Sequence, residues 1–150
     1  MSDASARQDM LDAIAAATDD IAFALASVGE AYDRLDENTA DRLEEALFRP
    51  LQTAYGRAQR THAAFAARVN LPTREFDTGH AAVASHGPGP AIEDAVEAAE
   101  RANEALAELQ DSMAPIEYGD PELRAGLADV RTLLAQVPVN ARGFLRTMGR

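Results

Sequence analysis

The sequence contains no cysteine, no tryptophan and no lysine. Without cysteine the chain has no disulfide, thiolate nucleophile, zinc finger or iron–sulfur cluster. Leucine, isoleucine, valine and phenylalanine are also scarce, since together they make up only 30 of the 150 residues. That fraction lies at the edge of the range in which chains become disordered. A stable core therefore has to be built largely from another kind of residue.

Alanine is that residue, with 33 copies in the chain. It has the highest helix propensity and is the smallest apolar side chain, so an alanine-rich core requires long helices packed closely together. A length of 150 residues is suited to one domain with one core. We therefore predict an all-α protein that forms a single domain over residues 1–150.

The chain is strongly acidic, because it contains 25 aspartates and glutamates and only 14 arginines, which gives a formal net charge of −11. This disfavours non-specific binding to nucleic acid and to anionic membranes. The N-terminal residues lack the basic and apolar segments of a signal peptide, and the longest uncharged helical stretch, 21–29, is too short to span a membrane. We expect a cytoplasmic protein without nucleic-acid or membrane partners. The exclusive use of arginine, with abundant alanine, glycine and proline, suggests a GC-rich bacterial genome.

Four stretches place core residues at alternating steps of three and four, which is the spacing of helices with one buried face. We predict helices over about 6–36, 39–70, 90–113 and 121–148. Their predicted core residues are Leu11, Ile14, Thr18, Ile21, Leu25, Val28, Tyr32 and Leu35; then Phe48, Leu51, Tyr55, Ala58, His62, Phe65 and Val69; then Ile92, Ala95, Ala99, Ala102, Leu106, Leu109 and Met113; and finally Leu123, Leu127, Val130, Leu134, Val137, Ala141, Phe144 and Met148.

Two prolines and three connections shape the expected bundle. Pro50 and Pro138 each remove a backbone donor within a predicted helix, so we expect a kink at each. The connections before residue 39 and over 114–119 are short, which favours two antiparallel helix hairpins. The connection over 71–89 is long enough either to cross the bundle or to stay at one end.

Charge favours one arrangement of the four predicted helices, which carry −5, +2, −6 and +2 in chain order. In a square bundle that follows chain order, each acidic helix borders two basic ones. The alternative places the first helix beside the third and brings the two most acidic helices together. We therefore predict an antiparallel up-down-up-down four-helix bundle. Surface ion pairs contribute only about 0.2–1 kcal/mol each, so this charge pattern is a bias and not a cause.

The three histidines are the first candidates for chemistry. His62 occupies a core position, where it is either a buried neutral imidazole with a hydrogen bond, a phosphoacceptor or a metal ligand. His80 and His86 lie in the long connection, and two ligands are too few for a metal site. No Glu-x-x-His pair, nucleophile elbow or phosphate-binding loop occurs in the sequence. We therefore expect no catalytic residues, no metal and no cofactor, and lean against an enzyme.

Arginines form the second candidate. In the predicted bundle, Arg68, Arg74, Arg142 and Arg146, with Arg150, gather at the end where two helices begin. Cations at helix C-termini ordinarily stabilise the helix dipole, which is the simpler interpretation of these residues. Together they could instead bind an anionic ligand, because helix N-termini and guanidinium groups both favour carboxylate and phosphate. Tyr55 and His62 could line an interior pocket for such a ligand.

A protein interface is the third candidate. Phe23 is predicted to lie opposite the core face of the first helix, among small alanines, where a second chain could pack. From these observations we predict a non-catalytic helical-bundle module for binding another protein or for self-association, with a homodimer as the simplest assembly. The alternative function is a bundle that binds a small molecule or anion.

Overall fold

The computed structural model describes residues 2–77 and 87–148. The helical elements are α1 (Asp3–Tyr32), α2 (Glu37–Leu43), the π-helical turn η1 (Glu44–Phe48), α3 (Arg49–Arg68), α4 (Pro88–Asp111), the short α5 (Ala114–Glu117) and α6 (Pro121–Met148). No strand occurs within the two described ranges. The prediction of an all-α protein is therefore confirmed. The predicted bounds of the fourth helix match α6, and the other ends differ by two to four residues.

Side chains begin three of these helices by accepting hydrogen bonds from free backbone amides. Ser2 accepts from the Ser5 amide at the start of α1, and Asp36 accepts from the Thr39 amide at the start of α2. Asp120 accepts from the Leu123 amide at 2.8 Å, so α6 begins at residue 121, the start that the sequence predicts. Each of these three helix starts therefore has a local side-chain cap, and only the start of α6 coincides with its predicted residue.

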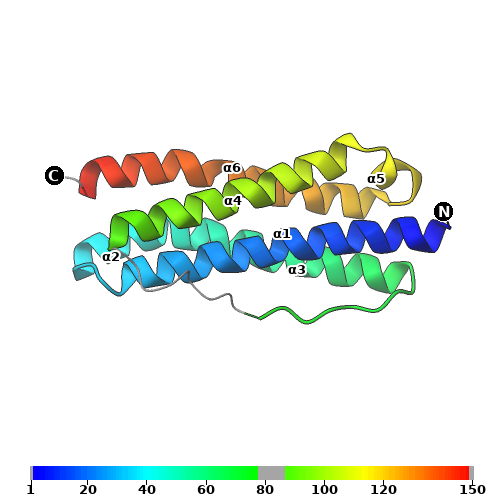
Figure 1. The fold of residues 1–150 in the computed structure, drawn as a ribbon, viewed down its shortest axis with the longest axis horizontal. Helices are drawn as coiled ribbons and strands as arrows, with labels where there is room; N and C mark the ends of the chain where they lie inside the picture. The colour runs from blue at the N-terminus through cyan, green and yellow to red at the C-terminus, as the bar shows by residue number, and fades with distance from the viewer. Residues whose placement is uncertain (1, 78–86, 149–150) are drawn as a thin grey trace.

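Four helical rods lie side by side in the order α1, α4, α6 and α3 around the core, with α2, η1 and α3 joined end to end as one rod (Figure 1). Each rod packs against two neighbours, while α1 lies diagonally opposite α6 and α3 opposite α4. The contact between α1 and α4 is the most extensive of these. The predicted arrangement, in which the first and third helices avoid each other, is therefore wrong.

The direction of α4 also differs from the predicted up-down-up-down order. The end of α4 lies beside the start of α1, where Arg7 Nε donates to the Tyr118 carbonyl at 3.0 Å. After α3 the chain turns at Asn70, which has a φ of 59°, and runs back along the same helix. The Tyr55 hydroxyl donates to the Asp77 carbonyl at 3.0 Å, which fastens the end of this segment to α3. Segment 69–77 thus runs back along α3, α4 begins at the other end of the bundle, and α4 runs antiparallel to α1.

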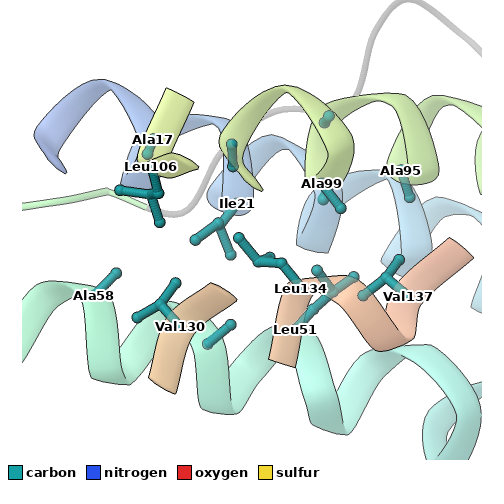
Figure 2. Packing of buried hydrophobic residues seen from close by; sticks show 14 of the residues in the cluster. Ala17, Ile21, Leu51, Ala58, Ala95, Ala99, Leu106, Val130, Leu134 and Val137 are labelled. Atoms are coloured by element: carbon teal, nitrogen blue, oxygen red, sulfur yellow. The ribbon is translucent and has the colours of Figure 1, made fainter. Parts of the chain in front are cut away.

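Alanine packing explains why two acidic helices are neighbours. The facing sides of α1 and α4 are lined by buried small residues, among them Ala17, Ala24, Ala31, Ala95, Ala98, Ala99 and Ala102. Figure 2 shows Ile21 of α1, Ala99 of α4 and Leu134 of α6 directed into the same core. Most of the acids of α4 are exposed, so their repulsion is screened by water. Burial of apolar area along two long helices outweighs that repulsion.

The predicted core is otherwise largely correct. All of the predicted positions in α6 are buried except Met148, which is partly buried, and the first five of α4 are buried as well. Tyr32 and Met113 are exposed, because α1 ends at Tyr32 and Met113 follows the end of α4. A periodic pattern continues to predict burial beyond the point where the helix has ended.

The two prolines have different effects. Pro50 lies in the first turn of α3, directly after the π-helical turn, so the regular α-helical hydrogen bonding is interrupted just before the proline. Pro138 lies inside α6, which continues as a helix to Met148. A proline therefore does not by itself end a helix whose core face is continuous on both sides.

Candidate functional site

The predicted cluster of arginines at one end does not form. Arg68 ends α3 beside the start of α6, whereas Arg142 and Arg146 lie near the end of α6, at the other end of the bundle. The misplacement follows directly from the reversed direction of α4 and α6. Arg150 lies outside the described residues.

Arg68 already has partners. Its guanidinium donates to both carboxylate oxygens of Asp120, at 2.7 and 2.9 Å, and to Glu122 at 3.0 Å. This hydrogen bonding lowers the pKa of Asp120, which also caps α6. Arg68 therefore ties the end of α3 to the beginning of α6.

Arg74 lies in the returning segment 69–77 and fastens it to α1. Two of its nitrogens each donate to Asp19 at 2.9 Å, which is the bidentate geometry of a strong arginine–carboxylate pair. Its guanidinium also stacks over the Phe76 ring, 4.6 Å from the ring centre. The predicted ligand-binding arginine is thus engaged within the chain.

Tyr55 and His62 both lie beneath this returning segment. His62 is only 3% exposed, as its core position predicts, and its ring meets Phe76 edge-on at 5.3 Å. Its Nδ1 is buried and lacks a partner within the described chain, so the expected hydrogen bond at that nitrogen is missing. Burial and the nearby Arg74 lower the pKa of His62, although Asp12 acts in the opposite direction. His62 is therefore a neutral imidazole packed under the returning segment 69–77.

The remaining candidates differ from their predicted surroundings. Phe23 is only partly exposed and packs against the core cluster, so the outward ring that the sequence predicts is not observed. His80 and His86 lie outside the described residues. Within 2–77 and 87–148, no three histidine, aspartate or glutamate side chains come close enough together to hold a metal ion.

An open groove that the sequence did not reveal lies between the α2–η1 segment and the C-terminal half of α6. Its volume is about 1,070 Å³. The lining residues are Asp36, Asn38, Thr39, Asp41, Arg42, Glu45, Ala46, Val139, Asn140, Gly143, Phe144 and Thr147. These come from two segments about 100 positions apart in the chain, so no local pattern could have revealed them.

Pro50 affects the backbone on the η1 side of this groove. Pro50 has no amide to donate to the carbonyl four residues earlier, which is that of Ala46. The side-chain amide of Asn140 in α6 replaces the missing donor, because it donates to the Ala46 carbonyl at 2.9 Å. The side chain that satisfies the interrupted helix is therefore also a wall of the groove.

Apolar groups and charges are separated within the groove. Phe144 is buried in its floor beside partly buried Ala46, and Val139 is 58% exposed at its side. Three exposed carboxylates, those of Asp36, Asp41 and Glu45, line the groove on the α2–η1 side. The hydrogen bond from Thr39 lowers the pKa of Asp36, which keeps that carboxylate charged. The groove therefore combines the apolar residues Ala46, Val139 and Phe144 with carboxylates along its α2–η1 side.

None of the helices in the described part of the chain combines the length and the apolar character that crossing a membrane requires. The chain matches no protein-family model, no curated protein and no solved structure.

Proposed function

We propose that this chain is a non-catalytic helical-bundle module for protein interaction, and that it binds a basic amphipathic helix of a partner protein in the groove between α2–η1 and α6. The observation that supports this most directly is the groove itself, with exposed Val139 and buried Phe144 in an apolar surface bordered by Asp36, Asp41 and Glu45. An apolar centre with a polar border is the usual anatomy of a protein interface.

Charge determines which partner suits this groove. Three carboxylates line it against a single arginine, Arg42, which stacks over the Phe144 ring at 6.0 Å from its centre. The whole chain carries −11, so a second copy would be repelled at long range while a basic segment would be attracted. An amphipathic helix can present apolar residues at i and i+4 to such a groove and place its basic residues beside the carboxylates.

The test compares two equally exposed apolar residues at opposite ends of the bundle. Val139 is 58% exposed in the groove, and Ile116 is 61% exposed in α5. A synthetic helical peptide with leucine on one face and arginine on the other serves as the probe, with a glutamate version for comparison. Fluorescence anisotropy should show binding of the arginine peptide that Val139→Asp weakens by at least about tenfold and Ile116→Asp leaves unchanged.

Either a peptide-binding result or an oligomeric-state result would overturn this proposal. Equal binding of the glutamate peptide, or equal weakening by both substitutions, would show that the groove is not the docking surface. Light scattering on a size-exclusion column provides the second: a dimer that Val139→Asp dissociates would identify the occupant as another copy of this chain.

A further inference from the structure

The side of the bundle formed by α3 and α6 is basic, although the protein as a whole is acidic. Helix α3 carries four arginines and no aspartate or glutamate. It packs against α6, while the two acidic helices α1 and α4 pack against each other on the other side. The molecule is therefore divided into an acidic and a basic side, and the basic side attracts anions independently of the groove described above.

A hollow of about 230 Å³ lies on this basic side, between α3 and α6. It is lined by Arg57, Arg60, Thr61, Ala64, Arg68, Glu122 and Ala125. A second hollow of about 380 Å³ shares Arg57 and Arg60 with the first. Because water takes up about 30 Å³ per molecule, the smaller hollow has room for a small oxyanion.

Thr61 supplies a hydroxyl that the protein itself does not use. The residue is only 8% exposed, and its hydroxyl has no hydrogen-bond partner within the described chain. By contrast, Thr18, Thr132 and Thr147 each donate to the carbonyl four residues earlier in their helices. A nearly buried hydroxyl without a partner, on the wall of a hollow, is an available donor for a ligand.

The arginines around Thr61 differ in how far they are engaged. Arg68 is held by the acids in the first turn of α6, as described above. Arg57 donates from Nη2 to Asp129 at 2.9 Å, but its Nε is buried without a partner. Arg60 is exposed and has no ion-pair or hydrogen-bond partner within the described residues. Two guanidinium groups with donor capacity to spare thus border the same hollow.

We propose that the hollow between α3 and α6 is a binding site for a small oxyanion, such as a phosphoryl group. Arg60 contacts the anion directly, Thr61 donates its hydroxyl, and Arg57, one turn earlier in α3, contributes a second positive charge. Arg68, fixed by its carboxylate partners, forms the end of the site. Guanidinium and hydroxyl donors are the groups that proteins use for phosphoryl oxygens.

The test measures binding of inorganic phosphate and pyrophosphate by isothermal titration calorimetry at constant ionic strength. The wild-type chain should bind pyrophosphate saturably. Arg60→Gln should weaken this binding by about tenfold or more, and Thr61→Val, which keeps the shape of the side chain, should weaken it severalfold. Arg49→Gln is the matched control, because Arg49 lies on the same helix, is exposed, and pairs with Glu45 outside the hollow.

A specific site and a diffuse attraction give different results. If Arg49→Gln weakens binding as much as Arg60→Gln, the anion is attracted by the general charge of the helix and the proposal is wrong. It is equally wrong if the wild-type chain shows no saturable binding. Helical circular dichroism of each variant shows whether the fold is intact, and Thr61→Val tests the site without changing any charge.

Discussion

Gly126 allows α3 and α6 to come together next to Thr61. A Cβ atom at this position would clash with the Thr61 hydroxyl oxygen, which is the nearest atom, and would lie 2.8 Å from its Cγ2. Because Thr61 is β-branched and nearly buried, it cannot move aside freely. Gly126→Ala should therefore lower the free energy of unfolding by about 1–3 kcal/mol in urea denaturation.

The control for this substitution is Gly143→Ala in the same helix. There the nearest atom to an added Cβ is an Arg146 nitrogen at 4.0 Å, which is ordinary contact. Alanine is favoured over glycine inside a helix by about 0.5–1 kcal/mol, so this variant should be slightly more stable than wild type. Equal stability of the two variants would contradict the steric role of Gly126.

His62 should make the stability of the fold depend on pH. Burial lowers its pKa in the folded protein below the value of about 6.5 in the unfolded chain. The unfolded chain therefore binds the proton more tightly, so stability is complete above about pH 6.5 and falls as the pH drops below it. The loss approaches about 1.4 kcal/mol per pH unit until the folded protein itself is protonated.

The measurement compares wild type with His62→Phe, which keeps an aromatic ring beside Phe76 but cannot titrate. Urea denaturation at several pH values from 5 to 8 gives the free energy of unfolding of each protein. As the pH falls below about 6.5, the free energy of unfolding of the wild type should decrease relative to that of His62→Phe. A difference that is constant over this range would show that His62 does not titrate between the two states.

At the scale of the element, the joined helix α2–η1–α3 depends on a neighbour to complete its hydrogen bonds. Local helix propensity explains the helix on both sides of Pro50. It does not explain which group donates a hydrogen bond to the Ala46 carbonyl. That carbonyl is satisfied by Asn140, which is 94 positions away in the chain. The sequence predicted the interruption from a property of proline alone, whereas the compensating contact required the helices to be packed.

Asn140→Ala should therefore destabilise the protein by about 1 kcal/mol, because it leaves a partly buried carbonyl without a donor. In a chain that already carries Pro50→Ala, the restored amide at position 50 can donate to Ala46 instead. The cost of Asn140→Ala should then be smaller. A double-mutant cycle from urea denaturation measures this coupling, and additive effects of the two substitutions would refute it.

At the scale of the molecule, the arrangement of helices can be tested by distance. The chain has no cysteine, so spin labels can be placed only where cysteine is introduced. Labels at Gln8 and Glu117 should be close together, because the neighbouring Arg7 and Tyr118 are hydrogen-bonded. In an up-down-up-down bundle the same labels would be separated by roughly 40 Å, the length of a helix of about 27 residues.

A second pair of labels gives the opposite result and serves as the control. Glu93 lies near the start of α4, at the far end of the bundle from Gln8. The distance between labels at Gln8 and Glu93 should therefore be long, and it would be short in the up-down-up-down arrangement. Electron–electron double resonance measures both distances in frozen solution. A long first distance with a short second one would reverse our assignment of the topology.

Residues close together in the chain determined much of this protein by themselves. Alanine content, core residues at steps of three and four, and the Asp120 cap predict helices and their buried faces, since these depend on neighbours within a turn or two. Only the tertiary structure decided that α1 lies beside α4. Burial along their alanine faces outweighs the repulsion between exposed acids, and segment 69–77 runs back along α3 before α4 begins. The groove and the basic hollow depend on that helix arrangement, because each is formed by residues from helices distant in sequence.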